Sequence, residues 1–170
     1  MIPARSILIV VGLILTACAT PGTADPAIAQ AGRRAMEAEM TALVPPAGSP
    51  CPPDAATWTV VQAQARERIA AAFADPAKTR LLDVLLRDTN RQACTLGGGV
   101  DSYSPTSTSV HGDSASLQAR VGIWSRFRAV GQPGTPEPHN LEDCDFKLIR
   151  PSGGWVVSDF SCQFVPGHGP

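Results

Sequence analysis

The five cysteines are the residues whose chemistry the sequence defines most sharply. Cys18 lies near the N-terminus, whereas Cys51, Cys94, Cys144 and Cys162 are spread through the rest of the chain. The four cysteines after Cys18 are an even number, which predicts two disulfides if the chain is exported. The alternative is a metal site, but no two of these cysteines have Cys-x-x-Cys spacing, and the three histidines fall in loop-like or terminal segments. We therefore expect disulfides, and neither a metal nor a cofactor.

A second set of side chains could bind anions. One face of a predicted strand carries Arg120, Trp124, Arg126 and Arg128. Three guanidinium groups on one sheet face suit lipid headgroups or cell-wall polymers. The alternative, which we favour, is that they pair across the sheet with Asp145 and Asp159. Trp124 and Trp155, both expected on this face, could mark a protein interface, for which a homodimer is the natural form.

The N-terminus has the pattern of an export signal. Arg5 precedes nine residues without a polar side chain, Ile7 to Leu15. This segment is too short to cross a bilayer, which needs about 20 apolar residues. A basic start followed by a short apolar segment is typical of a signal peptide.

The segment that follows, Leu15-Thr16-Ala17-Cys18, resembles a bacterial lipobox at all four positions. The resemblance implies that Cys18 is lipidated and that the chain is cleaved before it. Two or three acyl chains would hold the protein at the membrane, because each buried methylene contributes about 0.8 kcal/mol. An ordinary secretory signal is the alternative. By resemblance to lipoprotein sorting rules, Ala19 favours the outer membrane, with the protein facing the periplasm.

The mature chain has the size of a single domain. Removing residues 1–17 removes Arg5 and leaves 153 residues with 13 basic and 15 acidic side chains. That length can bury one core, and the balance of charge gives no reason to expect nucleic acid as a partner. We expect a lipidated tether over 18–25, a helix and proline-rich linker over 26–53, an α+β domain over 54–165 and a tail over 166–170.

Helical patterns fill the first half of the domain. Asp25-Pro26, Asp54 and Asp75-Pro76 are candidate helix starts, since aspartate caps a helix and proline suits its first turn. The apolar residues after them recur at helical spacing. They are Ile28, Ala35, Met36, Met40 and Leu43, then Trp58, Val61, Ala65, Ile69 and Ala72 or Phe73, then Leu81, Leu82, Leu85 and Leu86.

The second half has the pattern of a sheet. Gly97-Gly98-Gly99 is interpreted as a flexible joint, with short strands over Val100–Ser104 and Ser107–His111 and a tight turn at Gly112-Asp113. The strongest strand follows, because apolar residues occupy alternate positions over a dozen residues. The apolar positions are Leu117, Ala119, Val121, Ile123, Phe127 and Ala129.

A hairpin is predicted over residues 144–162. A three-residue loop, Ser152 to Gly154, sets Arg150 against Val156, Lys147 against Asp159 and Cys144 against Cys162. It turns Val156 inward and Trp155 outward. The register predicts a Cys144–Cys162 disulfide, which leaves Cys51–Cys94 to clamp the helices, although four cysteines allow two other connectivities.

These features together resemble the nuclear transport factor two-like superfamily. They are the helical N-terminal half, the long alternating strand at 117–130, and the closing hairpin with Gly153-Gly154-Trp155. The resemblance covers about residues 54–165 and implies an α+β fold, with N-terminal helices packed on a curved antiparallel sheet to form a cone. The serine-rich middle and the cysteines depart from the superfamily pattern. The superfamily mixes enzymes, ligand-binding modules and assembly domains, so the fold alone does not give the function.

The resemblance also suggests where acid–base chemistry would lie. Enzymes of the superfamily use aspartate, histidine or tyrosine inside the cone, and the candidates here are Asp101 with Tyr103, and His111 with Asp113. Such a pair transfers protons if it is buried next to a ligand. The alternative, which we favour, is that Tyr103 is a packed aromatic residue and that His111 and Asp113 are solvated turn residues.

The sequence thus favours a membrane-anchored envelope lipoprotein that acts as a non-enzymatic binding or assembly module. It would bind a small apolar ligand in the cone or a protein partner on the sheet face. The alternatives are a small hydrolase or isomerase that acts in the cone, and an accessory subunit of an envelope or secretion complex.

Overall fold

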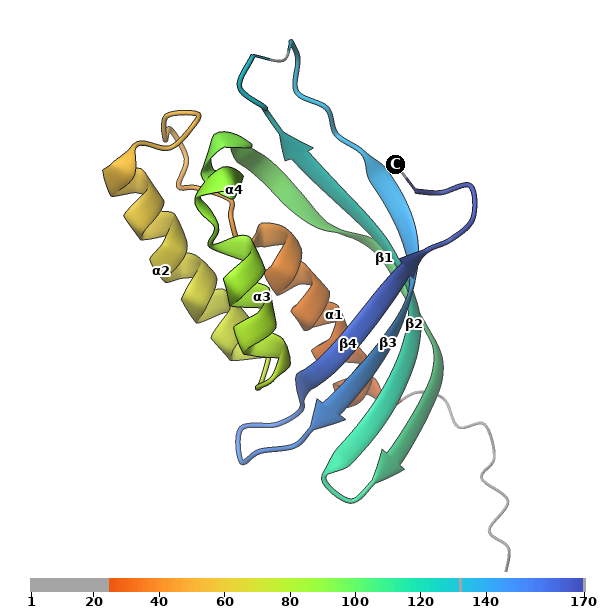
Figure 1. The fold of residues 1–170 in the computed structure, drawn as a ribbon. Helices are drawn as coiled ribbons and strands as arrows, with labels where there is room; N and C mark the ends of the chain where they lie inside the picture. Colours follow the sequence, from red (N-terminus) through yellow and green to blue (C-terminus); the bar gives the residue numbers. More distant parts are fainter. Residues whose placement is uncertain (1–24, 132, 170) are drawn as a thin grey trace, which may run out of the picture.

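The computed structural model describes residues 25–131 and 133–169, and the predicted signal peptide, Cys18 and nearly all of the tether lie outside them. In this described part of the chain, four helices precede four strands (Figure 1). The helices are α1 (Pro26–Thr41), α2 (Ala55–Ala72), α3 (Ala77–Leu85) and α4 (Asp88–Gln92), and the strands are β1 (Thr95–His111), β2 (Ser114–Phe127), β3 (His139–Ile149) and β4 (Val156–Phe164). The predicted α+β fold with a curved antiparallel sheet is confirmed.

Helix α1 begins as its sequence predicts. The Asp25 carboxylate accepts a hydrogen bond from the Ala27 backbone N–H at 2.9 Å, and proline occupies the first turn. Ile28, Ala35 and Met36 are buried in the same core as the sheet. Helix α1 therefore belongs to the same folded unit as residues 54–165.

Helices α2 and α3 form the expected hairpin, but they start differently. Asp54 caps α2 by accepting a hydrogen bond from the Thr57 N–H at 2.7 Å, and the predicted apolar face of α2 is buried. The predicted cap at Asp75 is wrong, because Pro76 is the residue that precedes α3 and it provides no side-chain cap. The Asp75 carboxylate instead binds the Thr79 hydroxyl at 2.7 Å and the Lys78 Nζ at 2.9 Å.

The four strands pair in the order β1-β2-β3-β4, and every pair is antiparallel. Strand β2 confirms the predicted alternation from Leu117 to Ile123, where the apolar side chains are buried toward the helices, whereas Phe127 is only partly buried and Ala129 lies beyond the strand. The helices lie against one face of this curved sheet, and the core fills the space between the two layers (Figure 1).

Strand β1 differs from the prediction of a flexible joint followed by two short strands. It is one strand of 17 residues that includes Gly97-Gly98-Gly99. The glycines are packing positions: a Cβ at Gly99 would lie 2.8 Å from the Trp124 indole nitrogen, and one at Gly98 would collide with the Met40 carbonyl oxygen at the end of α1. Glycine is needed here because another chain segment approaches its backbone closely.

The β3–β4 hairpin confirms part of the predicted register. Cys144, Phe146 and Lys147 face Cys162, Phe160 and Asp159 as expected. Ser158 is then an extra residue in β4, so Leu148 faces Val157, and the loop covers 150–155 instead of 152–154. Such a bulge moves the side chains between it and the hairpin loop to the opposite face. Val157 and Trp155 are therefore buried, while Val156, predicted to point inward, is only partly covered.

Two disulfides join the chain as predicted. Cys144–Cys162 links β3 to β4, and Cys51–Cys94 joins the segment before α2 to the residue before β1, which encloses α2 to α4. The C-terminal segment also contacts the sheet, since the Leu141 N–H donates to the His168 carbonyl at 3.2 Å. Within residues 25–131 and 133–169, no helix is both long and apolar enough to cross a bilayer.

Candidate functional site

The three residues predicted to line a pocket, Asp101, Tyr103 and His111, are not brought together. Asp101 is the extra residue at a register shift in β1, so it does not share a face with Tyr103 as expected. Its carboxylate is exposed and lies 2.6 Å from the Nδ1 of His139. His111 is exposed at the end of β1, and its neighbour Asp113 pairs with Arg150 at 3.1 Å. These positions hold no shared reacting centre.

Tyr103 instead packs between the sheet and α1. Its hydroxyl contacts α1 at Gly32, where a Cβ would collide with it. The hydroxyl oxygen is buried and has no hydrogen-bond partner among the described residues, and burial raises the pKa of the phenol far above its ordinary value. Tyr103 is thus a packed aromatic residue that stays protonated at neutral pH.

The predicted basic row lies on the outer face of the sheet, and two of its arginines are paired there. Arg120 binds Asp143 through two hydrogen bonds of 2.8 and 2.9 Å, and Arg126 lies 3.6 Å from Glu137. The expected partners Asp145 and Asp159 were wrong, because the β2–β3 register sets Arg120 directly opposite Asp143. Arg128 is exposed beyond the end of β2. Paired surface arginines of this kind leave little charge free for an anionic surface.

Trp124 and Trp155 do not form the predicted exposed patch. Trp155 is only 6% exposed, because the β4 bulge turns it into the core, and Arg150 covers its ring at 5.1 Å. Trp124 is partly buried and stacks on His139, with 6.5 Å between the ring centres. The structure therefore has no exposed Trp124–Trp155 surface of the kind predicted for a homodimer.

His139 stands at the centre of a charged surface cluster that sequence reasoning missed. Its two ring nitrogens face Asp101 and Glu137, at 2.6 and 3.6 Å. The hydrogen bond to Asp101 is the main cause that raises the pKa of His139 above 6.5. The cluster joins residues 38 positions apart, so only knowledge of the strand pairing could have revealed it. All three side chains are solvent-exposed, and the arrangement is a pH-sensitive surface contact.

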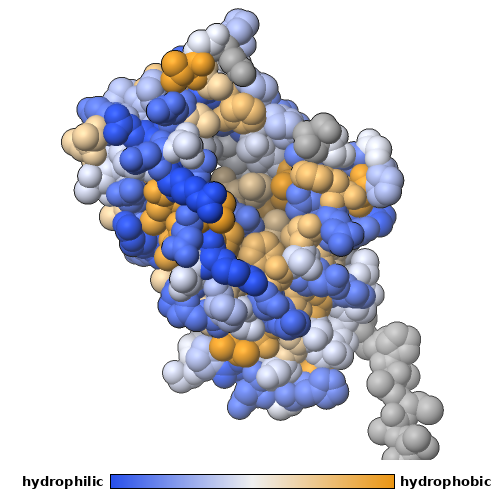
Figure 2. Space-filling view, viewed as in Figure 1, coloured by the Kyte–Doolittle hydropathy of each residue, from blue (hydrophilic) through white to orange (hydrophobic). Residues whose placement is uncertain are grey.

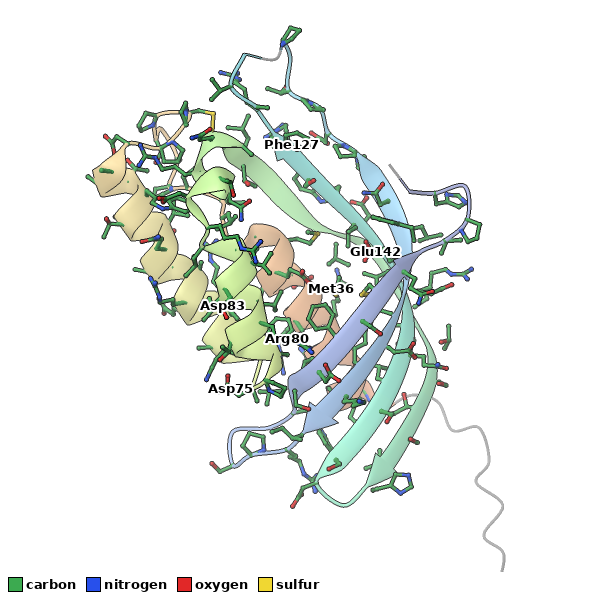
Figure 3. The ribbon with its side chains drawn as sticks, viewed as in Figure 1. Met36, Asp75, Arg80, Asp83, Phe127 and Glu142 are labelled. Atoms are coloured by element: carbon green, nitrogen blue, oxygen red, sulfur yellow. A yellow bond between two sulfur atoms is a disulfide. The ribbon has the colours of Figure 1, made fainter. Side chains whose placement is uncertain are left out.

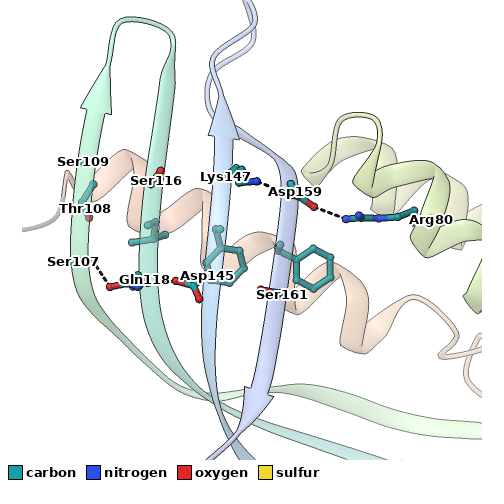
Figure 4. Close-up of a pocket in the computed structure, with 13 residues that line it drawn as sticks. Arg80, Ser107, Thr108, Ser109, Ser116, Gln118, Asp145, Lys147, Asp159 and Ser161 are labelled. Atoms are coloured by element: carbon teal, nitrogen blue, oxygen red, sulfur yellow. Dashed lines mark hydrogen bonds and ion pairs between the residues drawn. The ribbon is translucent and has the colours of Figure 1, made fainter.

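A shallow polar groove of about 670 Å³ crosses the outer face of the sheet (Figure 4). Gln118 accepts a hydrogen bond from Ser107 at 2.8 Å and donates one to Asp145 at 2.7 Å. Asp159 accepts from Lys147 and from Arg80 of α3. These side chains bind one another, whereas Thr108, also in the lining, has a hydroxyl oxygen that is buried and has no hydrogen-bond partner among the described residues.

The inner side of the sheet carries a different kind of site. The helical layer and the sheet separate to leave a recess with apolar residues along its floor (Figure 2). From the same viewpoint, Met36 of α1 and Glu142 of β3 lie between the two layers, with Phe127 above them and Arg80 below them (Figure 3). Met36 is only 2% exposed, so it belongs to the core beneath the recess. Glu142 points inward because it shares the strand face of Cys144, Phe146 and Leu148, all of which are buried.

Glu39 faces Glu142 from the helical side. It lies on the inner stripe of α1, between Met36 and Ala42. Part of the residue still touches solvent, but its Oε2 is buried and accepts no hydrogen bond from a described residue. Burial, and then the charge of Glu142, raise the pKa of Glu39 from 4.5 to about 7. Burial also raises the pKa of Glu142.

Neither carboxylate forms an ion pair within the described part of the chain. Glu142 lies 3.9 Å from the Cys144 sulfur, and that sulfur is bonded to Cys162. A disulfide sulfur carries neither a proton to donate nor the thiolate charge that binds metals. The grouping of Glu142, Cys144 and Cys162 therefore lacks the ligands of a metal centre.

Two signals in the sequence could have identified these acids. Glu39 interrupts the apolar stripe of its helix, three residues after Met36 and three before Ala42. Glu142 is two residues before Cys144, so the alternation of β3 already assigns it to the inner face. An acidic residue on a predicted core face requires a partner or a function.

Comparison with known proteins shows the fold alone. No family model and no curated protein matches the sequence. The crystal structure of the intermembrane space region of the chloroplast protein ARC6 is similar, with a TM-score of 0.59 at 11% identity, and the match covers 80% of this chain and 93% of that one. The two chains therefore share an arrangement of helices and sheet with little sequence in common.

Two other solved structures match less well. One is an NTF2-like protein with a cystatin-like fold from Novosphingobium aromaticivorans, with a TM-score of 0.36 at 16% identity over 53% of this chain and 55% of that one. The other is a SEC-C motif containing protein from Rhodopseudomonas palustris, with a TM-score of 0.29 at 15% identity over 79% and 88% of the two chains. These TM-scores are too low to support a family assignment, so membership of the nuclear transport factor two-like superfamily stays a prediction.

Proposed function

We propose that this chain is an envelope lipoprotein, anchored through Cys18, whose folded domain is a non-enzymatic binding or assembly module. The observation that carries the proposal is the short distance along the chain between the lipobox and a disulfide-bonded domain. Helix α1 begins at Pro26, eight residues after Cys18. Fully extended, that tether reaches about 29 Å at most, so an anchored domain would stay close to the bilayer.

The disulfides support export. Cys51–Cys94 and Cys144–Cys162 both close within the domain, and disulfides persist in oxidising compartments such as the periplasm. Ala19 favours the outer membrane by the sorting rule given above. We therefore propose a location at the outer membrane, facing the periplasm.

Binding is favoured over catalysis because the candidate acid–base residues lie apart. Asp101 is on the outer sheet face, Tyr103 lies against α1, and His111 is at a strand end. Acid–base catalysis needs such groups within hydrogen-bond reach of one substrate. What the domain offers instead is surface for binding, namely the polar groove on the outer face of the sheet and the recess between the helices and the sheet.

The anchoring claim is tested by replacing Cys18 with serine in the full chain. We expect the wild-type protein to pellet with membranes and to incorporate labelled palmitate, because acyl chains hold it there. The C18S variant should lose the label and keep its uncleaved leader. Thr20→Ser, two residues further on, is the matched control and should behave as wild type. If C18S is processed and retained like the wild type, the anchor is not at Cys18.

A further inference from the structure

We propose that the end of the domain at which α1 begins docks on the phospholipid bilayer, with Val110 and Ile149 in contact with lipid. The inference rests on the proposed anchor at Cys18 and goes beyond it. An anchor keeps the domain near the membrane, but it does not fix which surface of the domain meets the lipid. The occupant of this surface is the same bilayer that holds the acyl chains.

Three connections and the start of α1 meet at this end of the molecule. They are the α2–α3 turn, the β1–β2 turn and the β3–β4 loop (Figure 1). Val110 lies near the end of β1 and Ile149 at the end of β3, and they pair with Ala115 and Ser114 at the start of β2. The two aliphatic side chains therefore lie at the same end of the sheet, next to the turns.

Apolar side chains at this end are exposed to solvent. Val110 is 48% exposed and Ile149 is 37% exposed. Pro26 at the α1 start, Pro76 in the α2–α3 turn and Pro151 in the β3–β4 loop are exposed as well. Such groups gain free energy when they leave water for the boundary between the headgroups and the acyl chains. A bilayer would cover apolar surface that the described part of the chain leaves open.

The charges at this end are compatible with a lipid surface. Asp113 pairs with Arg150 at 3.1 Å, and Asp75 pairs with Lys78 at 2.9 Å. The Asp25 carboxylate caps the N-terminus of α1. An unpaired carboxylate would be repelled by anionic headgroups and would be costly to remove from water. Each acidic residue of these turns and of the α1 start instead has a partner within the domain.

The short tether makes a contact of this size sufficient. A few aliphatic and proline side chains would not hold a free protein at a bilayer. Once Cys18 is in the membrane, however, docking is an intramolecular step, and a short linker gives an effective concentration in the millimolar range. Only seven residues lie between Cys18 and α1, so the linker holds the α1 start, and the turns beside it, close to the lipid.

Quenching of tryptophan fluorescence by brominated lipid tests the proposal, because bromine on the acyl chains quenches only indoles that lie close to them. Trp155 belongs to the β3–β4 loop, where Arg150 covers its ring at 5.1 Å. Trp124 stacks on His139, at the end of the sheet that holds the β2–β3 loop. The acylated full-length protein is reconstituted into vesicles of phosphatidylethanolamine and phosphatidylglycerol, with and without bromine on the acyl chains.

We expect the brominated vesicles to quench the wild-type protein through Trp155. Trp155→Phe should remove most of the quenching, whereas Trp124→Phe should leave it unchanged. Circular dichroism shows whether each variant is folded. The next variant retains every tryptophan, so the test does not depend on Trp155→Phe.

The V110S/I149S variant assigns the docking to the aliphatic side chains. It should reduce the quenching at least about twofold, because serine loses the apolar contact with lipid. V60S/V130S is the matched control, since Val60 is 45% exposed and Val130 is 65% exposed. Val60 lies in the first half of α2 and Val130 in the β2–β3 loop, both toward the opposite end of the domain (Figure 1). The control should be quenched like the wild type.

The proposal is overturned if wild-type protein that floats with the vesicles is not quenched, if Trp155→Phe keeps the quenching, or if V110S/I149S is quenched as strongly as wild type. Flotation separates these outcomes from failure of the anchor. An acylated protein that does not float with the vesicles disproves the anchor and the docking together. One that floats without quenching disproves the docking alone.

Discussion

Glu39 is a carboxylic acid on the apolar face of a helix. Ionising its side chain at neutral pH costs more free energy in the folded state than in the unfolded chain. In the unfolded chain its pKa is near 4.5, whereas burial and the nearby Glu142 raise it to about 7 in the folded protein. Between these values the folded state holds a proton that the unfolded state has lost. The free energy of unfolding therefore falls as pH rises through this window.

Glu39→Gln should remove that part of the pH dependence. We expect the wild-type free energy of unfolding to fall by up to about 3 kcal/mol between pH 4.5 and 7.5 on account of Glu39, since each pKa unit corresponds to about 1.4 kcal/mol. The variant should lose this slope and exceed wild type in stability at pH 7.5. Urea unfolding at several pH values measures it.

Glu142 also has a raised pKa and is present in both proteins, so the difference between them reports Glu39 together with its repulsion from Glu142. His139 has a raised pKa and also lowers stability as pH rises, but it is present in both proteins and cancels in the difference. Asp143 and Asp159 have lowered pKa values, so the stability that they contribute is lost mainly below about pH 4. Parallel pH profiles for wild type and E39Q would show that Glu39 is not buried as described.

At the scale of elements, the sequence predicted those whose pattern depends only on which face is buried. The stripe of α2 and the alternation of β2 follow from the periods of 3.6 and 2, and both are confirmed. The β4 bulge at Ser158 was missed because a bulge inserts one residue without any change of composition. Trp155 and Val156 consequently exchanged the faces that we had assigned to them.

The glycine run and the acidic pair show a second limit of prediction from the sequence. The sequence Gly97-Gly98-Gly99 is typical of a loop. Only the close approach of Trp124 and of the α1 carbonyl shows why a strand needs glycines at these positions. Glu39 and Glu142 are 103 positions apart, so their proximity depends on how α1 lies across the sheet. The acid on each apolar face could be predicted, but the pairing of the two could not.

Gly98→Ala tests the packing interpretation of the glycine run. Its Cβ would meet the Met40 carbonyl oxygen, which is backbone and cannot rotate away. We expect a loss of about 1–3 kcal/mol in the free energy of unfolding, the usual cost of overpacking. Gly153→Ala is the control, because no atom lies within 4 Å of a Cβ there. Equal stabilities for the two variants would restore the interpretation of the run as a loose joint.

The two disulfides close loops of different length and should stabilise the domain unequally. The separations are 18 residues for Cys144–Cys162 and 43 for Cys51–Cys94. By the loop-entropy relation they contribute about 3 and about 4 kcal/mol. We expect the C51A/C94A variant to unfold at a lower urea concentration than C144A/C162A. The reverse order would mean that strain or residual structure in the unfolded chain outweighs loop length.

At the scale of the whole molecule, the short tether before α1 would orient the domain relative to the membrane. Helix α1 starts at the end of the domain that also holds the β1–β2 turn and the β3–β4 loop, whereas the β2–β3 loop and the C-terminus lie at the other end (Figure 1). An acyl chain on Cys18 would bring the first end closest to the lipid, because only seven residues lie between Cys18 and α1. The second end would then face the periplasm.

Ala19→Asp should move the anchored protein from one membrane to the other. Position 19 directly follows the lipidated residue, and by resemblance to lipoprotein sorting rules an aspartate there retains the protein in the inner membrane. We expect wild type to fractionate with the outer membrane on a sucrose gradient and A19D with the inner one, with Ala19→Ser unchanged. The domain itself should be unaffected, since residue 19 lies seven positions before α1. If A19D stays with the outer membrane while still carrying lipid, the sorting step reads some other part of the chain, and the folded domain becomes the first place to look for it.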